Sequence, residues 1–386
     1  SSKLLYTATI LMDLCVGATI LLLSLFGLHV TQRESIIGML GALMILSRIP
    51  CNLIGGPISD RIGRRPMMVF AGGMLLAALG VLGSADTVWM LALYSILCGA
   101  SAGLIWFNIE AALGDHGQGM DLHHRTGYFN LSFSTGMIIG PWLIGQVFTF
   151  SETAALWVTV AAAATVTLCL SIAPLSPIES NADQKERNLL RSPKRYFQAA
   201  LLTNLIIWIG VGVVRFLLPK QVVDLGYTSA VVGNLSAICY GFMMAGFIWL
   251  KFNPKWHYQR WPMIVALLLG ILGAGLLGLS ENMTVLVVGL ALYGIAISFS
   301  YYSVIFAALD SPVGRGHRSG QHEAALAIGM IIGSQFGGIL AEGFGPQAPY
   351  GGVVFVCILA MGAVWRMAAI RPGTLQIPVR PFNREE

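Results

Sequence analysis

Apolar stretches long enough to cross a bilayer alternate with short polar breaks along almost the whole chain. A transmembrane helix needs about 20 consecutive apolar residues. The stretches are continuous rather than alternating, which excludes the strands of a transmembrane barrel. Twelve stretches qualify: residues 4–29, 35–55, 66–84, 87–112, 127–149, 153–174, 197–219, 228–250, 262–280, 283–309, 321–342 and 349–370. The pattern therefore predicts an all-α membrane protein with twelve transmembrane helices.

The longest polar break divides the predicted helices into two sets of six. It covers residues 175–196, is rich in charged residues, and is interpreted as a linker. The expected domains are therefore an N-terminal six-helix bundle over 1–174 and a C-terminal six-helix bundle over 197–370. Residues 371–386 form the expected tail.

An internal repeat relates the two predicted halves. Residues 136–140 and 329–333 both read Gly-Met-Ile-Ile-Gly, and residues 124–127 resemble 317–320 at the same separation. The two copies are separated by an even number of predicted helices, so both run in the same direction across the membrane. This is a parallel repeat, which predicts two similar bundles related by an axis along the membrane normal.

Composition and charge also indicate an integral membrane protein. Only 11% of the residues are charged, whereas an average soluble domain has about 25%, and this difference excludes an ordinary soluble enzyme. The net charge of +5 lies in short loops and leaves no basic face for nucleic acid. Of the 23 Lys and Arg residues, 19 lie on the side of the two termini.

Lys and Arg accumulate on the cytoplasmic side of membrane proteins. The loops on the opposite side hold only Arg33 and Lys220. Both termini and the linker are therefore expected in the cytoplasm, with the chain in a bacterial inner (plasma) membrane. The expected partners are the lipid bilayer and a small-molecule substrate, and we expect a monomer.

The break between the second and third predicted helices carries a glycine, acid and arginine pattern. Residues 56–66 read Gly-Pro-Ile-Ser-Asp-Arg-Ile-Gly-Arg-Arg-Pro. This loop resembles motif A of the major facilitator superfamily, and the twelve helices and parallel repeat extend the resemblance to the whole architecture. It implies a secondary active transporter that works by alternating access.

In that family, the loop latches the cytoplasmic ends of the two halves in the outward-open state. The resemblance implies a gating set of Gly56, Asp60, Arg61, Gly63, Arg64, Arg65 and Glu110. Asp60 would face the start of the eleventh helix, and Glu110 would pair with an arginine of the loop. The alternative is that the arginines only fix topology. The matching loop of the second half, 251–262, keeps basic residues without the glycines and the acid, which predicts a one-sided latch.

Glycines recur at helical spacing in the fifth and eleventh predicted helices. The motif comprises Gly136, Gly140, Pro141 and Gly145, with Gly329 and Gly333 in the second copy. It is similar to the antiporter motif of the 12-helix drug:proton antiporter-like branch, although Ile144 stands where a glycine is usual. Ser95 likewise replaces a usual basic residue. Pro141 predicts a kink. The alternative is generic close packing of small residues.

Charged and polar residues inside the predicted helices are functional candidates, because charge is costly in a bilayer. Asp13 and Arg48 fall at similar depth on adjacent predicted helices, so we expect an ion pair. Movement of Arg48 would switch the protonation of Asp13, and the alternative is a static structural pair. The other candidates for the cavity are Asn130, Asn204, Trp208, Arg215, Tyr240 and Tyr301.

Arg215 and Glu323 each have a simpler structural interpretation. Arg215 lies near the outer end of its segment, where it could instead extend to the membrane surface. Glu323 begins the eleventh predicted helix, where an acid favours the dipole and is expected to cap.

The main functional hypothesis is proton-coupled export of a small organic or amphiphilic solute. One alternative is an organic-anion uniporter or symporter that uses Arg48 and Arg215 as counter-ions. An alternative of another class is a non-transporting membrane receptor on the same scaffold. The sequence contains no catalytic motif, so an enzyme is not expected. No metal site or cofactor is expected beyond the proton as coupling ion.

Overall fold

The computed structural model describes residues 2–114, 120–172, 194–256, 258–309 and 315–367. These ranges contain thirteen α-helices, one 3₁₀ turn and no strand. The helices are α1 (Ser2–Val30), α2 (Glu34–Ile62), α3 (Arg64–Gly83), α4 (Val88–Gly114), α5 (Met120–Phe150), α6 (Glu152–Ile172), α7 (Lys194–Phe216), α8 (Leu218–Asp224), α9 (Ser229–Phe252), α10 (Trp261–Leu279), α11 (Met283–Leu309), α12 (Arg315–Phe344) and α13 (Ala348–Met367), with η1 at Pro254–Trp256.

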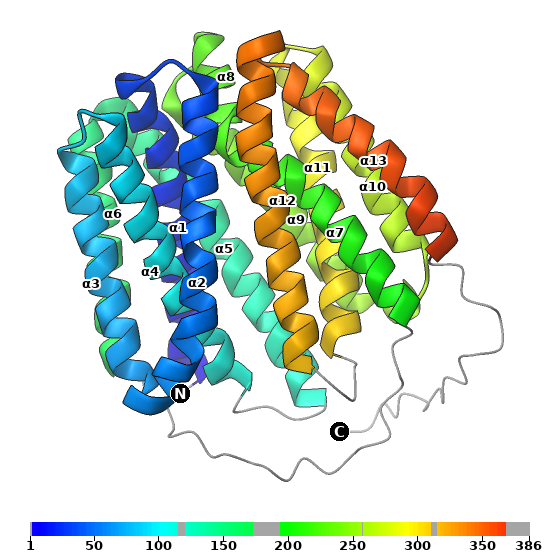
Figure 1. Cartoon of the computed structure of the whole chain (residues 1–386), viewed down its shortest axis with the longest axis horizontal. Helices are drawn as coiled ribbons and strands as arrows, with labels where there is room; N and C mark the ends of the chain where they lie inside the picture. Colours follow the sequence, from blue (N-terminus) through cyan, green and yellow to red (C-terminus); the bar gives the residue numbers. More distant parts are fainter. Residues whose placement is uncertain (1, 115–119, 173–193, 257, 310–314, 368–386) are drawn as a thin grey trace.

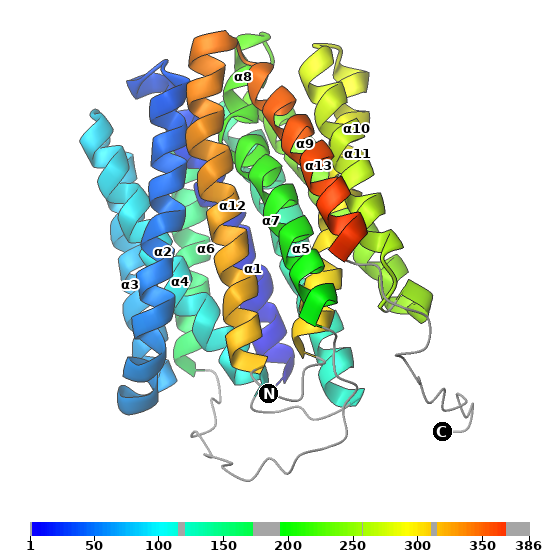
Figure 2. The ribbon, with the colours of Figure 1, turned by 45° about the vertical axis from the view of Figure 1, so that its right-hand side comes forward.

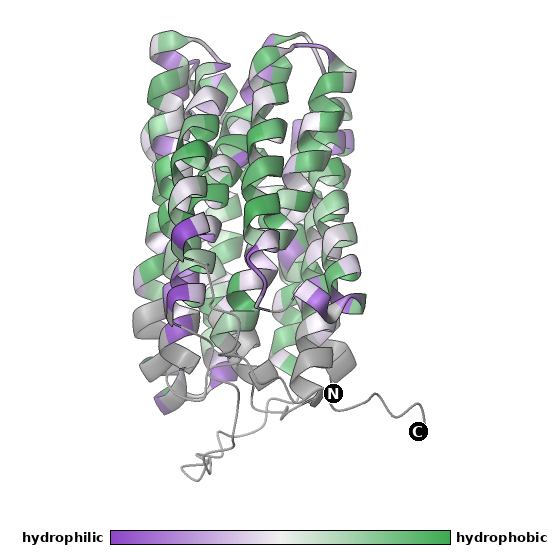
Figure 3. Cartoon of the chain, turned by 90° about the vertical axis from the view of Figure 1, so that its right-hand side faces the viewer, coloured by the Kyte–Doolittle hydropathy of each residue, from purple (hydrophilic) through white to green (hydrophobic). Residues whose placement is uncertain are grey.

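Twelve of these helices are long and apolar enough to cross a membrane, which confirms the predicted number. The short helix α8 was not predicted, because its seven residues carry no spanning signal. Figure 3 shows mostly apolar residues along the bundle, with scattered hydrophilic positions. The chain is therefore an integral membrane protein.

The predicted loop over residues 56–66 is almost entirely helical, which corrects that expectation. Helix α2 continues to Ile62 and α3 begins at Arg64, so the chain reverses at Gly63 alone. Gly63 has φ 95°, a conformation that favours glycine because a Cβ would clash with the backbone. Hydropathy marks the lipid-facing part of a helix, and polar turns can extend the same helix into water.

The helices form two groups that lie side by side (Figures 1 and 2). Helices α1–α6 make one half, and α7–α13 make the other. The halves meet mainly where α5 packs against α9 and where α12 packs against α2. We call the end where α1 begins the proximal end, and the end where α1 finishes and α2 begins the distal end.

Glycine contacts hold the helices of each half together, and they repeat between the halves. Gly140 of α5 lies against the backbone of Leu14 on α1, and Gly333 of α12 lies against Ile209 on α7. Gly136 makes the same contact with Ile10, as Gly329 does with Leu205. A Cβ at any of these glycines would collide with backbone. The motif glycines therefore allow close helix packing, and an antiporter role of the motif stays a prediction.

The same correspondence extends to α2 and α4. Gly99 of α4 lies against the backbone oxygen of Met44 on α2, and Gly294 of α11 lies against that of Cys239 on α9. Gly99 and Gly294 are 195 residues apart, and so are Met44 and Cys239, whereas Gly136 and Gly329 are 193 apart. The repeat seen in the sequence is therefore also a repeat of contacts.

A second set of glycines joins the two halves near the distal end. Gly38 of α2 lies against Gly338 of α12, and Gly233 of α9 lies against Gly145 of α5. The two contacts occupy equivalent places in the repeat, one on each side of the molecule. Small residues allow the helix backbones to approach closely. We call these four residues the distal glycine seam.

Polar contacts reinforce the distal glycine seam. Between α5 and α9, the Gln146 side-chain amide donates to Oδ1 of Asn234 at 2.9 Å. On the other side, the guanidinium of Arg33 lies 2.9 Å from a carboxylate oxygen of Glu342 on α12. The distal ends of the halves are therefore held together on both sides.

Helix α8 contributes a buried cation to the same end. Lys220 is 7% exposed, and its Nζ contacts Asp224 in α8 and lies 3.2 Å from Glu34 of the opposite half. Burial alone would lower the pKa of Lys220, but hydrogen bonds and the charges of Asp224 and Glu34 outweigh burial and raise it. Lys220 is therefore protonated at neutral pH and binds the two halves together.

We predict that Lys220→Met weakens distal closure, because it removes the cation shared by Glu34 and Asp224. Closure is measured as the rate at which a short bifunctional maleimide joins cysteines introduced by Gln146→Cys and Asn234→Cys, in a chain whose six native cysteines are replaced. Lys220→Met should slow this reaction several-fold. The exposed Lys255→Met provides the control, and equal rates in both variants would contradict the role of Lys220.

Candidate functional site

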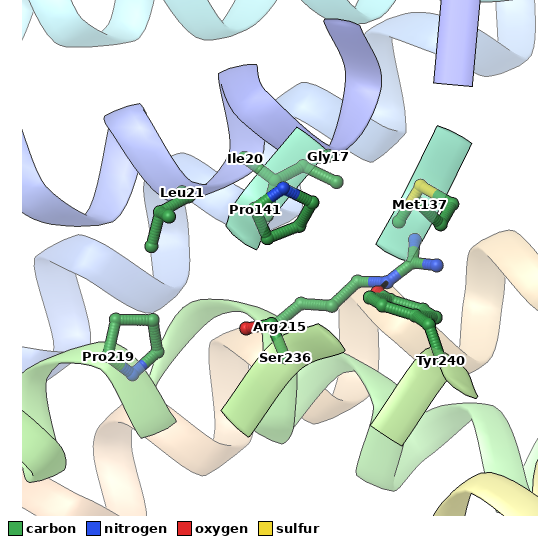
Figure 4. Close-up of a pocket in the computed structure, with 9 residues that line it drawn as sticks. All are labelled: Gly17, Ile20, Leu21, Met137, Pro141, Arg215, Pro219, Ser236 and Tyr240. Atoms are coloured by element: carbon green, nitrogen blue, oxygen red, sulfur yellow. Dashed lines mark hydrogen bonds between the residues drawn. The ribbon is translucent and has the colours of Figure 1, made fainter. Parts of the chain in front are cut away.

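A pocket lies between the two halves, below the distal glycine seam (Figure 4). Its empty volume is about 280 Å³ when the open mouth is included, and the enclosed part is far smaller than a typical small-molecule site. The lining comes from α1, α5, α7, α8 and α9: Gly17, Ile20, Leu21, Met137, Pro141, Arg215, Pro219, Ser236 and Tyr240. The pocket is mostly apolar, with a single charged side chain.

That charged side chain is Arg215 of α7. Its Nε donates a hydrogen bond to the Tyr240 hydroxyl at 2.7 Å, and an Nη lies 3.5 Å from the Met330 sulfur. The guanidinium also lies over the rings of Trp208 and Tyr240, at 5.3 and 5.5 Å from their centroids. In the described part of the chain, no carboxylate forms an ion pair with Arg215. The structure places this guanidinium between the halves, as Figure 4 shows.

Asp13 lies on the N-terminal side of the same region. It is buried in α1 beside Gly136 of α5, with 1% of its surface exposed. Met137, the residue after Gly136, lines the pocket that contains Arg215. By the repeat, the place of Asp13 beside Gly136 corresponds to the place of Trp208 beside Gly329. An acid of one half and a tryptophan of the other therefore occupy equivalent positions.

The expected ion pair between Asp13 and Arg48 is wrong. An Nη of Arg48 lies 3.7 Å from a carboxylate oxygen of Glu323 on α12, and its guanidinium lies 5.7 Å from the Trp106 ring centroid. Helices α1 and α2 make few contacts with each other, because α2 packs mainly against α4 and α12. Arg48 therefore links the halves through α2 and α12.

Glu323 is likewise not a helix cap. Helix α12 begins at Arg315, two turns before Glu323. The hydrophobic pattern placed the helix start too late, because its first turns are polar. Glu323 therefore lies well inside the helix, where it faces Arg48.

A buried polar cluster lies beside Trp208 in the C-terminal half. His322 of α12 is 1% exposed, and its Nδ1 lies 3.3 Å from the side-chain amide nitrogen of Asn204 on α7. The rings of Tyr301 and His322 are 4.9 Å apart, and those of Trp208 and Tyr301 are 6.4 Å apart. The structure therefore brings together three predicted residues around a histidine that was not predicted.

Three polar atoms of this cluster lack a hydrogen-bond partner among the described residues. They are Nε2 of His322, Oδ1 of Asn204 and Nε1 of Trp208. A buried polar atom without a partner costs about 1–3 kcal/mol. The signal for His322 was available in the sequence as an ionisable residue inside a spanning segment, next to Glu323.

Other predicted site residues lie elsewhere. Asn130 is buried in α5 but does not line the pocket. Arg61 and Arg65 are exposed at the proximal end, and Arg64 is buried at the start of α3. The side chains of Asp60 and Glu110 lie outside the described residues, so their expected latch contacts stay predictions, as does any gating role of Gly56.

Aromatic packing fills the corresponding loop of the second half. The indole nitrogen of Trp256 donates to the backbone oxygen of Leu250 at 2.9 Å, and its ring contacts Tyr302 and Phe306. This loop therefore has a buried apolar anchor. Among the described residues, His, Cys, Asp and Glu form no group that could hold a metal ion.

Comparison with known proteins gives consistent relatives. The model of the Major Facilitator Superfamily matches residues 5–321. The inner membrane transport protein YajR of Escherichia coli (strain K12) is 24% identical over 359 residues, which cover 86% of this chain and 73% of YajR.

Solved structures share the fold. The crystal structure of the nucleoside transporter NupG matches with a TM-score of 0.72 at 15% identity, covering 96% of this chain and 99% of NupG. The human organic anion transporter MFSD10 (TETRAN) matches with a TM-score of 0.68 at 17% identity, covering 94% and 98%. These relatives are transporters rather than enzymes. With a family match over most of its length and twelve spans in the same fold, the chain belongs to the major facilitator superfamily and is a transporter of a solute.

Proposed function

We propose that the protein transports a small organic anion, which binds between its two halves at Arg215. The observation that carries the proposal is the setting of this guanidinium. It lines the pocket between the halves and has phenol, thioether and aromatic neighbours, with no carboxylate ion-paired to it among the described residues. A cation buried in a membrane protein is normally paired or marks a substrate pathway.

Two other cations between the halves already have carboxylate partners. Arg48 pairs with Glu323, and Lys220 contacts Glu34 and Asp224. Arg215 is therefore the cation best placed to bind an anionic group that arrives with the solute. One structural relative has a title naming an organic anion transporter, but fold similarity alone does not fix a substrate, so the proposal stands on Arg215.

Arg48 has a different proposed role. Its pairing with Glu323 joins α2 of one half to α12 of the other. Alternating access requires the halves to separate at each end in turn, and separation of α2 from α12 would break this pair. Arg48 would therefore couple the movement of the halves rather than bind the anion.

We predict that Arg215→Gln lowers the affinity for small organic anions at least tenfold, because it removes the charge at the pocket. Binding is measured as the thermal stabilisation of the purified protein by a panel of aliphatic and aromatic carboxylates, with matched amines and amides. Arg195→Gln, an exposed change on the same helix, should bind like the wild type. Stabilisation by the amines alone, or equal affinities in Arg215→Gln and wild type, would exclude the proposal.

Proton coupling is a second proposal, carried by Asp13. This carboxyl group is buried on α1 beside Gly136 of α5, and the next residue of α5, Met137, lines the pocket of Arg215. Entry of an anion at Arg215 would change the electrostatic potential at Asp13, and uptake or release of a proton would balance that change. Exchange of the solute for protons, in the direction of export, is the form that the sequence favours.

We predict that Asp13→Asn abolishes proton movement while anion binding persists. Asparagine retains the size of the side chain but cannot exchange a proton. The measurement is the internal pH of proteoliposomes, reported by a trapped dye when the solute is added outside. Substitution of the neighbouring Leu14 by Ile tests whether any change at this packed position has the same effect. Wild-type proton flux in Asp13→Asn would remove Asp13 from the mechanism.

We also propose that the proximal end faces the cytoplasm of a bacterial inner membrane. The excess of Lys and Arg in the proximal loops supports this orientation. A cysteine from Gln32→Cys at the distal end should react with an impermeant thiol reagent in intact cells. One from Gln259→Cys should react only after permeabilisation, and the reverse pattern would invert the topology.

A further inference from the structure

The cluster of Asn204, Trp208 and His322 lies next to the Arg215 pocket rather than apart from it. Trp208 connects the two, because the Arg215 guanidinium lies 5.3 Å from the centroid of its ring. Asn204 lies one helical turn from Trp208 on α7, and its amide nitrogen approaches His322 on α12. Polar groups therefore continue from the pocket into the C-terminal half.

The chemistry of these groups is specific. The amide nitrogen of Asn204 is a donor, so Nδ1 of His322 accepts and, in the neutral imidazole, Nε2 carries the proton. Nε2 of His322 and Nε1 of Trp208 are then two donors, and Oδ1 of Asn204 is an acceptor. All three atoms are buried and have no partner among the described residues.

A structural role alone does not account for this arrangement. Elsewhere in the same half, some buried polar groups meet partners directly, as where the Tyr293 hydroxyl donates to the Ile207 backbone at 2.6 Å. Other buried polar atoms there lack a partner among the described residues, namely those of Tyr196, Gln221 and Tyr258, but the cluster gathers three such atoms around one histidine. Three unmet groups beside aromatic rings, connected to the pocket through the contact of Trp208 with Arg215, are typical of a site that a polar ligand completes.

We infer that the cluster binds a planar ring on the transported anion, and that this ring presents two hydrogen-bond acceptors and one donor. The inference rests on the proposed function, because the anionic group of the same solute occupies Arg215. The substrate class is therefore a heterocyclic carboxylate whose ring carries carbonyl and N–H groups. Arg215 supplies affinity for the charge, and the cluster supplies selectivity for the ring.

The test compares two planar ring carboxylates that share the charge and differ in the ring. Orotate carries ring carbonyl and N–H groups, and benzoate carries none. Affinities for both are measured on the detergent-purified full chain by thermal stabilisation or calorimetry. The wild type should bind orotate about tenfold or more tightly than benzoate.

Substitutions then remove one polar atom at a time. Trp208→Phe removes the indole N–H but keeps an aromatic face for Arg215, and Asn204→Leu and His322→Phe remove the other groups. Each should reduce the preference for orotate about fivefold or more, with benzoate affinity nearly unchanged. Benzoate binding also shows that each variant is folded. A control substitution, Tyr227→Phe at an exposed site, should retain the wild-type preference.

The outcomes separate the two proposals. If benzoate and orotate bind equally in the wild type and Arg215→Gln weakens both, the ring site is wrong and the anion site stands. An orotate preference that survives all three cluster substitutions also overturns the ring site. If neither carboxylate binds, or if Arg215→Gln binds both as the wild type does, the proposed function fails and the ring site fails with it.

Discussion

Helices in a lipid bilayer are not drawn together by the hydrophobic effect, so close packing must hold them. In this protein that packing depends on glycines whose missing side chains admit a neighbouring backbone. Gly140 and Gly333 bring α5 and α12 against the first helix of their own half. Gly145 and Gly338, on the same two helices, bring the opposite half equally close at the distal end. Helices α5 and α12 therefore determine both the shape of each half and the contact between the halves.

Charge is distributed according to this contact. Near the distal end, Lys220 of one half lies among carboxylates of both, and Arg33 pairs with Glu342. Farther toward the proximal end, Arg48 pairs with Glu323 across the interface. Between these levels, the guanidinium of Arg215 has no such carboxylate in the described part of the structure. These other cations between the halves are therefore already neutralised by carboxylates. An incoming anion would neutralise Arg215 and so change the net charge between the halves.

The sequence predicted what depends on local composition and missed what depends on neighbours in space. Spanning helices follow from hydropathy, and their number was correct. The partner of Arg48 depends on α2 packing against α12, a contact between residues 275 positions apart that no local pattern encodes. Arg215, Trp208 and Asn204 were identified because they share one helix face. His322 was missed because only its charged neighbour, Glu323, was considered, and Glu323 was interpreted as a helix cap.

The repeat of contacts has a consequence for how such a chain can vary in length. Counterparts on α1, α2 and α4 are separated by 195 residues, and those on α5 and α12 by 193. The second copy is therefore two residues shorter between Gly294 and Gly329 than the first is between Gly99 and Gly136. A deletion inside a packed helix would rotate every later glycine by about 100° per residue away from its partner. The equivalent contacts are kept on both sides of the length change. Residues can therefore be gained or lost only between helices, where the change does not rotate the glycines of the next helix away from their partners.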